Sequence, residues 1–351
     1  MNKRLFVGIC AASVMLAAPV LAQTTNPSAT DETASNVVTS QAVVRELSAM
    51  TVGGIAARVG GFLSPQLLAD QGFDPDRASL FAIGDIGTGM SACGGDGRLG
   101  IWVSGGWSSI EDDFVSTAYD GNLYSVLFGA DYQMNDRLLA GIPFGYESSN
   151  IDTTFNTGNS ESDGFTIAPY AGYVLSRYFT VDVSGGYTFV SYDTRRIASG
   201  SSVTGSTDSN RWFIAGNVNA YYAIDRITLG GTMGYSYTRE NMDGFTESDS
   251  TSYTDRDFTI GQFRLGGTVG YQLGKVEPYL LTTYVYDAQM TKIAVGSGQA
   301  SPKNDRSGFD VGGGINFMLS DRVIGGFEGS TYVGRENFDS ATLTGNLRIK
   351  F

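Results

Sequence analysis

Residues 341–351 read ATLTGNLRIKF and alternate apolar with polar side chains as far as Phe351. Alternation with a period of two residues is typical of a β-strand that has one apolar face and one polar face. The same pattern recurs in earlier segments and brings the predicted strands to twelve: 98–108, 123–134, 138–148, 164–175, 178–192, 210–223, 227–238, 259–274, 276–288, 307–319, 322–334 and 341–351. The region from Arg98 onward is therefore predicted to be all-β.

The two faces of these strands differ in chemistry. In every segment one phase is apolar and holds no charged residue, as at Val126 and Phe128. The other phase is small and polar with scattered charges, as at Thr180 and Asp182. A water-soluble sandwich, the alternative fold, would turn long charged side chains outward. Small polar side chains instead suit a narrow lumen, with the apolar phase facing lipid.

Short and long connections alternate along the chain. Tight turns are predicted at 135–137, 176–177, 225–226, 274–275 and 320–321, and longer polar loops at about 109–122, 149–163, 193–209, 239–258, 289–306 and 335–340. Short periplasmic turns and long outer loops are typical of bacterial outer-membrane barrels, and aromatic residues gather near both strand ends as in interfacial belts. We therefore predict a 12-stranded antiparallel up-and-down transmembrane β-barrel.

The N-terminus predicts export from the cytoplasm. Residues 1–22 place Lys3 and Arg4 before an apolar run that ends at Ala22, the pattern of a cleaved signal peptide. After cleavage Cys93 is the only cysteine, so no intramolecular disulfide can form. We divide the chain into a signal peptide (1–22), a short passenger or linker (23–97) and an outer-membrane barrel (98–351) with its long loops outside the cell.

The composition excludes several functions. The 351 residues contain no His, which removes Ser-His-Asp catalysis and His-ligated metals. A formal net charge of −13 opposes nucleic-acid binding, which needs a basic surface. We therefore expect no enzymatic activity, no cofactor and no metal site.

Four motifs carry a resemblance to a known family. They are LGIWVSG at 99–105, LFGADY at 127–132, LAGIPFGY at 139–146 and the terminal LRIKF at 347–351. In this order and spacing the chain resembles the autotransporter β-domain of type V secretion. The resemblance implies a twelve-stranded barrel with a helix threaded through its lumen, which exports or anchors an N-terminal passenger. Residues 23–97 depart from it, because they are far too few for the β-helical passenger of many members.

The C-terminal strand predicts contact with the assembly machinery. Leu347, Ile349 and the terminal Phe351 lie on one phase and resemble the signal that the outer-membrane insertion machinery reads. We expect outer-membrane lipid, this machinery and periplasmic chaperones as partners, and a monomeric barrel.

Residues 41–63 are the candidate for the lumenal helix. Their apolar residues follow a loose helical spacing, with Arg45 and Arg58 on other faces. Gly53-Gly54 and Gly60-Gly61 each weaken a helix, by about 1 kcal/mol per glycine relative to Ala, but make it slim. We predict a helix in the lumen, and the alternative is a small helical hairpin in the periplasm or at the surface.

The strand phases also predict the charges that face the lumen. These are Asp131, Glu147, Asp182, Arg264, Glu277, Asp310, Glu328 and Arg348. The acids could bind Arg45 and Arg58, for example through Glu147, Asp182 or Glu328, or set ion selectivity. The alternative is a set of salt bridges that only hold the wall.

Three functions follow from these patterns. The leading hypothesis is an outer-membrane autotransporter-type translocator whose short N-terminal segment is exported or retained as a plug. One alternative is a passive small-solute pore, if residues 41–63 lie outside the barrel. Another is a surface interaction protein that presents the acidic, Ser/Thr-rich loops 193–209 and 239–258.

Overall fold

The computed structural model describes residues 33–70, 98–114, 116–291, 305–320 and 323–350. One helix, α1 (Ser35–Asp70), precedes all the strands. The strands are β1 (Leu99–Asp112), β2 (Tyr119–Asn135), β3 (Leu138–Thr153), β4 (Gly158–Ile167), β5 (Tyr170–Ser176), β6 (Phe179–Ala198), β7 (Ser201–Ile224), β8 (Ile227–Met242), β9 (Phe245–Thr246), β10 (Ser252–Tyr253), β11 (Arg256–Tyr271), β12 (Val276–Met290), β13 (Ser307–Ser320), β14 (Val323–Val333) and β15 (Phe338–Lys350). The predicted signal peptide, Cys93 and Phe351 lie outside the described residues.

The main sheet closes into a barrel. Each strand pairs antiparallel with its neighbours, and β1 pairs with β15 from Gly100↔Lys350 to Asp112↔Phe338. Strands β4 and β5 both pair with β3 and β6, so they share one position around the barrel. The break between them falls at Pro169, which has no N–H to donate to a ladder. The predicted twelve-stranded barrel is confirmed, with one position divided in two.

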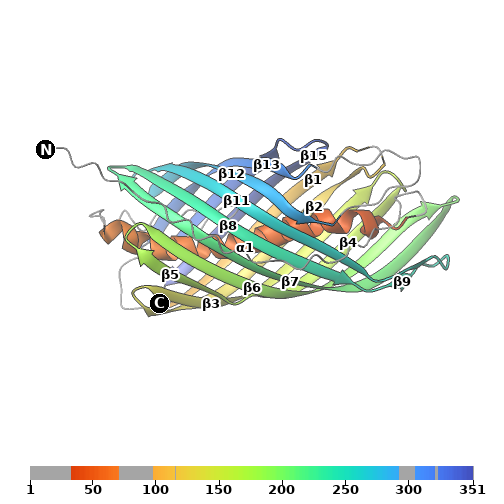
Figure 1. The fold of residues 1–351 in the computed structure, drawn as a ribbon, viewed down its shortest axis with the longest axis horizontal. Coiled ribbons are helices and arrows are strands. Elements are labelled where there is room, and N and C mark those ends of the chain that lie inside the picture. Colours follow the sequence, from red (N-terminus) through yellow and green to blue (C-terminus); the bar gives the residue numbers. More distant parts are fainter. Residues whose placement is uncertain (1–32, 71–97, 115, 292–304, 321–322, 351) are drawn as a thin grey trace.

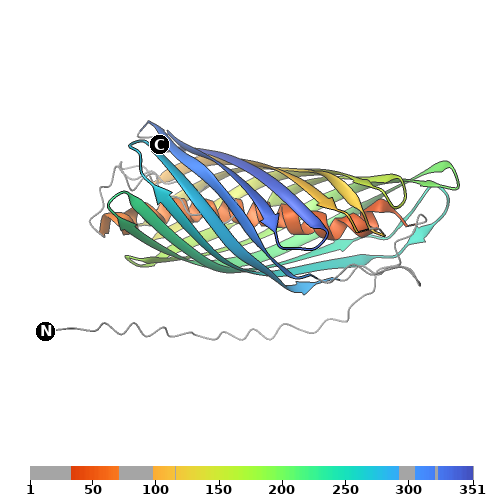
Figure 2. The ribbon, with the colours of Figure 1, turned by 90° about the horizontal axis from the view of Figure 1, so that it is seen from above.

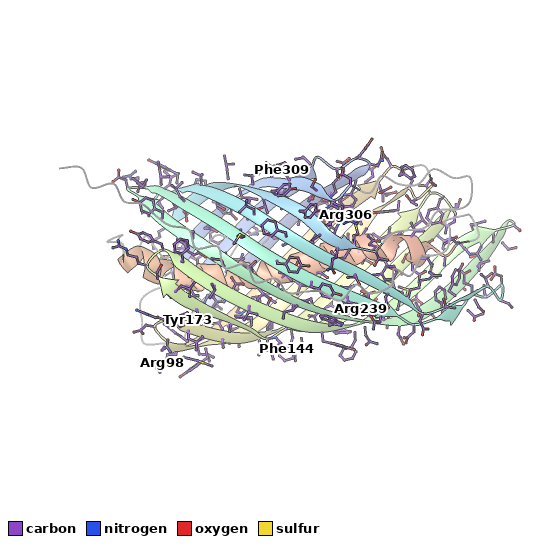
Figure 3. All side chains as sticks on the ribbon, viewed as in Figure 1. Arg98, Phe144, Tyr173, Arg239, Arg306 and Phe309 are labelled. Carbon is purple, nitrogen blue, oxygen red and sulfur yellow. The ribbon has the colours of Figure 1, made fainter. Side chains whose placement is uncertain are left out.

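The outer surface of the barrel is apolar. Along β4 and β5, as far as Leu175, buried side chains alternate with exposed or half-buried ones, and Phe165 and Tyr173 are among the exposed. Leu280 is 72% exposed, which in water would be costly for a leucine but suits contact with lipid. In Figure 3 the labelled Phe144, Tyr173 and Phe309 lie on the outside of the sheet. The predicted apolar phase is thus the outer one.

The predicted outer loops are too long, and two of them show this most clearly. β6 and β7 continue through the region assigned to loop 193–209 and turn only at Ser199 and Gly200, whose φ angles are positive, 50° and 79°. The loop predicted at 149–163 is likewise mostly strand, because β3 ends at Thr153 and β4 begins at Gly158. Beyond the membrane neither face of a hairpin contacts lipid, so the apolar phase ends there although the strand pairing continues.

α1 runs lengthwise through the barrel (Figures 1 and 2). It begins six residues before the predicted start at 41 and ends seven after the predicted end at 63. It lies against β1 to β8 and β11, and within the described residues it has no close backbone approach to β12–β15. No helix of the described residues is both long and apolar enough to cross a bilayer. The predicted lumenal location is therefore observed, and the helical hairpin is not.

Candidate functional site

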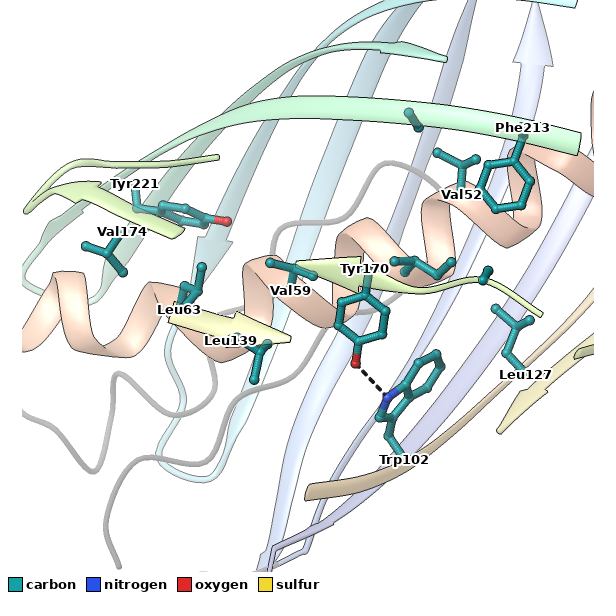
Figure 4. Close-up of a cluster of buried hydrophobic side chains, with 13 residues drawn as sticks. Val52, Val59, Leu63, Trp102, Leu127, Leu139, Tyr170, Val174, Phe213 and Tyr221 are labelled. Atoms are coloured by element: carbon teal, nitrogen blue, oxygen red, sulfur yellow. Dashed lines mark hydrogen bonds between the residues drawn. The ribbon is translucent and has the colours of Figure 1, made fainter. Parts of the chain in front are cut away.

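The candidate site is the lumen with α1 inside it, held in part by apolar contacts. Val52, Ile55, Val59 and Leu63 of the helix belong to one buried cluster, shown in Figure 4. Its wall members are Trp102, Leu127, Leu139, Ala168, Tyr170, Val174, Phe213, Ala215 and Tyr221. Large apolar residues therefore occupy the phase that was expected to be only small and polar. They lie where the helix covers the wall, so their apolar side chains are not exposed to water in the lumen.

Two further apolar clusters lie nearer the N-terminal end of α1. Ala42, Val43, Leu47 and Met50 pack with Ile110, Tyr119, Leu123, Ile151 and Phe338. Val44 packs with Val190, Tyr192, Met242, Phe258 and Ile260 on another part of the wall. The helix thus presents apolar side chains in several directions, as a helix surrounded by wall requires.

One ion pair joins the helix to the wall. Arg58 on α1 donates from Nε to Oδ2 of Asp131 on β2 over 2.7 Å, and both side chains are buried. The hydroxyl of Tyr170 donates to the same carboxylate over 3.1 Å and accepts the indole N–H of Trp102 over 3.0 Å. Arg348 of the last strand lies 3.9 Å from the other oxygen of Asp131. Asp131 therefore links the helix, β2 and β15.

Arg45 does not reach a carboxylate of the wall. It pairs with its helix neighbour Glu46 at 3.0 Å, and its guanidinium lies 3.9 Å from the centre of the Phe338 ring. The expected pairing with Glu147, Asp182 or Glu328 is not observed. The two arginines of the helix therefore differ, since among the described residues only Arg58 forms an ion pair with the barrel wall.

The remaining predicted lumen charges are all buried, and five of them, Glu147, Asp182, Arg264, Glu277 and Glu328, bond to other residues of the wall. Glu147 pairs with Arg211 at 2.6 Å. Asp182 accepts from the amides of Asn217 and Asn219, Glu277 accepts from Thr228, Glu328 accepts from Tyr279, and Arg264 donates to Gln262. Asp310 is 4% exposed.

Several charged residues of the lumen were missed from the sequence. Arg211 lies between Glu147 and Glu240, 2.6 Å from each, and the Tyr192 hydroxyl donates to Glu240 over 2.8 Å. Asp287 pairs with Arg335 at 2.6 Å and accepts from the Gln262 amide. Arg211 and Asp287 occupy the polar phase of predicted strands, and that phase is the signal that could have found them.

The N-terminal end of α1 is fixed at the mouth formed by the long hairpins. The Ser35 hydroxyl lies 2.7 Å from that of Thr153, and the Asn156 amide donates to the Thr33 carbonyl over 2.8 Å. The Ala34 N–H donates to the hydroxyl of Tyr253 over 2.9 Å. The helix therefore begins at the hairpin end and runs toward the end with the tight turns.

The short sheet of β9 and β10 packs on the start of α1 at this mouth. Phe245 and Tyr253 stack with ring centres 4.8 Å apart, and Phe245 packs on Ala34 and Val37. Burial raises the pKa of Tyr253 to about 12, so its hydroxyl stays protonated and donates to Glu247 over 3.2 Å. Glu247 also pairs with Arg196 of β6 at 2.7 Å.

The residues of the predicted insertion signal lie on β15 as far as the structure describes them. Ile349 is 40% exposed on the outer face and Leu347 is half-buried. The described residues contain no group of three or more Cys, Asp or Glu side chains able to hold a metal ion.

Comparisons with known proteins agree with this geometry. A family model described as Autotransporter beta-domain matches residues 101–330. The translocator domain of autotransporter NalP from Neisseria meningitidis is similar in structure, with a TM-score of 0.63, 12% identity and coverage of 74% of this chain and 90% of that one. The β-domain of the Bordetella autotransporter BrkA is similar with a TM-score of 0.62 and 14% identity, over 72% of this chain and 100% of that one. The transport unit of the autotransporter AIDA-I from Escherichia coli is similar with a TM-score of 0.57 and 12% identity, over 84% of this chain and 99% of that one. A search of curated proteins finds no significant match.

Proposed function

Because this chain belongs to the autotransporter β-domain family, we propose that its barrel carries residues 23–32 to the cell surface and retains α1 as a plug. The family makes the chain an outer-membrane translocator barrel, and such barrels are generally not enzymes. The open pore and the surface adhesin are not favoured. We extend the proposal to a monomer without catalytic activity, whose mature form begins near Gln23.

The direction of α1 carries this proposal. Its first turn is bonded at the mouth of the long hairpins, and Leu63 packs beside Val174 and Tyr221 near the tight turns. Strand β1 begins at the same end as these turns, where Leu99 pairs with Tyr132. This course of the helix, between the tight-turn end and the hairpin end of the lumen, supports export of the segment before Thr33.

The contacts of α1 support its retention after export. Asp131 and Arg58 are 2% and 4% exposed, and removal of one partner of a buried ion pair costs about 3–5 kcal/mol. The apolar clusters add attraction that is not directional. We propose that Asp131 and Arg58 hold the helix, that the other lumen charges stabilise the wall, and that Leu347, Ile349 and Phe351 are read by the insertion machinery, with periplasmic chaperones delivering the chain.

Site-specific labelling tests the proposal. In a Cys93→Ser background, Thr25→Cys should react on intact cells with a membrane-impermeant maleimide. Ser202→Cys at the exposed hairpin tip is the positive control, and Ser176→Cys beside a tight turn should react only after the outer membrane is opened. Labelling of position 25 only in opened cells, with position 202 labelled on intact ones, would show that the segment is not exported.

A further inference from the structure

The tight-turn end of the barrel carries exposed basic residues at regular places. Arg137, Arg177, Arg226 and Lys275 each lie in the turn between two neighbouring strands, and Arg98 directly precedes β1. All five side chains are exposed. We call these five residues the basic ring, because they are spread over successive hairpins around the barrel.

Little negative charge offsets the basic ring. The exposed acids in the same described turns are Asp136 and Asp225. Among the described residues no ion pair neutralises Arg137, Arg226 or Lys275. In a chain with a formal net charge of −13, this end is therefore locally basic.

The outward face at the opposite end is acidic. Its exposed carboxylates follow one another across neighbouring strands: Asp152, Glu161, Asp163, Asp193 and Asp208. In Figure 3 the labelled Arg98 and Tyr173 lie at the end away from Arg239 and Arg306. The exposed carboxylates at that end outnumber its arginines, among them Arg195, Arg239 and Arg306. The two ends of the barrel therefore differ in the sign of their charge.

Aromatic residues place the basic ring at the level of lipid headgroups. The Arg177 guanidinium lies 4.8 Å from the centre of the Tyr178 ring, and the Tyr178 and Tyr222 rings are 6.2 Å apart. Tyr222 is exposed on the outer face four residues before Arg226. Tyrosine rings of such belts sit at the membrane–water interface, so a basic side chain one step farther out ends among the headgroups.

We propose that the basic ring binds the headgroups of anionic phospholipids in the periplasmic leaflet of the outer membrane. Guanidinium and ammonium groups bind phosphate by charge-assisted hydrogen bonds. The five residues surround the barrel instead of converging on one spot, so no compact soluble ligand can contact them all. A layer of anionic lipid can, and each nearby Lys or Arg then favours it by about fivefold over neutral lipid.

Lipid selectivity measured by spin-label spectroscopy tests this proposal. The full chain, folded in phosphatidylcholine bilayers, is given spin-labelled phosphatidylglycerol or phosphatidylcholine, and the ratio of their association constants is determined. The measured ratio averages over all lipids around the barrel, and only some of them lie beside the basic ring. The wild-type ratio should therefore exceed about two, and it should fall toward one with added salt. The variant R137Q/R177Q/R226Q/K275Q should give a ratio near one. The matched control R195Q/R239Q/R306Q removes basic residues from the other end and should keep the wild-type ratio.

Each outcome decides the question. Equal ratios for wild type and the quadruple variant would overturn the proposal, and so would a loss of selectivity in the control alone. Selectivity abolished by inorganic phosphate, but not by sodium chloride of equal ionic strength, would identify a soluble phosphate ligand and also overturn it. If the quadruple variant does not fold, R226Q and K275Q are measured singly, and each must lower the ratio.

Discussion

Replacement of Asp131 by asparagine should release the helix from the lumen wall. The substitution keeps the shape of the side chain but removes the charge that faces Arg58 and Arg348. Arg58 is 4% exposed, so in the docked state its guanidinium would stay buried while it loses the carboxylate that Asp131 supplies. Such a loss costs about 3–5 kcal/mol, whereas the undocked helix exposes the same groups to water. At about 1.4 kcal/mol per factor of ten, undocking should become at least about 100-fold more frequent.

A cysteine on α1 reports undocking directly. Ser48 is 8% exposed and its hydroxyl has no hydrogen-bond partner within the described residues, so Ser48→Cys is a mild change. In a Cys93→Ser background this thiol reacts with a maleimide only when the helix leaves the wall, and the rate follows the undocked population when redocking is fast. Asp131→Asn should raise that rate at least about 100-fold.

Asp182→Asn is the matched control. Asp182 is also a buried wall aspartate, but its hydrogen-bond partners are Asn217 and Asn219 of the wall. Its substitution should change the labelling rate by less than about threefold, because additivity holds to within about 0.5 kcal/mol for sites that share no partner. Adding Arg58→Met to Asp131→Asn should lower the labelling rate part of the way back to the wild-type value, because the guanidinium that faces position 131 is removed. Equal rates for the two Asp→Asn variants would refute the conclusion that Asp131 holds the helix.

Three further predictions concern the whole barrel. Deleting residues 35–70 should turn a poorly conducting protein into a cation-preferring pore in planar bilayers, because buried wall acids outnumber buried arginines, and the preference should fade with salt; unchanged conductance would mean that α1 does not block the lumen. Phe351→Ser should lower the folded, heat-modifiable fraction of the protein on gels. If this variant assembled as well as the wild type, Phe351 would not be part of an insertion signal. Glu247→Gln should accelerate proteolysis between residues 243 and 255 by about tenfold, because Arg196 loses a buried carboxylate but keeps Asp249 at 2.9 Å. A loss of the folded, heat-modifiable form of the whole barrel would instead show that the effect is not local.

The strands could be predicted because lipid imposes a strict alternation. Along β2 every second residue from Tyr124 to Met134 faces outward, and none is charged. This signal stops at the membrane boundary, so the sequence predicts a loop where the outer halves of β6 and β7 lie. Their pairing from Tyr192↔Thr207 to Ala198↔Ser201 depends on cross-strand hydrogen bonds, which leave no apolar pattern.

The ends of the helix were harder to predict for a related reason. A helix packed on one side has one apolar stripe, whereas α1 is surrounded and buries Ser40, Thr39 and Asn36 as well as Val43 and Leu47. Without a one-sided pattern, the sequence does not distinguish the first turns from Ser35 from the polar residues that precede them. The environment of the helix, and not its propensity, therefore determines where it begins.

The identity of the lumen charges followed from strand phase, but their pairing did not. The strand phase indicates that Asp131 and Glu147 face the lumen, but it does not indicate which residue of α1 lies at the same height as each of them. That depends on strand stagger and on the height at which α1 stops, neither of which is local in sequence. Arg58 meets Asp131 because both lie nearer the tight turns, while Arg45 reaches the level of Phe338, where the nearest carboxylate is its own neighbour Glu46.

The three kinds of contact along α1 have different consequences for export. Apolar contacts such as those of Ile55 are not directional, so a moving helix can exchange one for another at little cost. A shift by one turn, about 5.4 Å, would however separate Arg58 from Asp131 and remove Ala34 from Tyr253. The apolar wall therefore attracts the helix at many heights, and the ion pair and the bonds at the mouth select one. In the function that we propose, the barrel first passes the chain and then holds α1, and the contacts divide accordingly into those that tolerate sliding and those that define the final position of the helix.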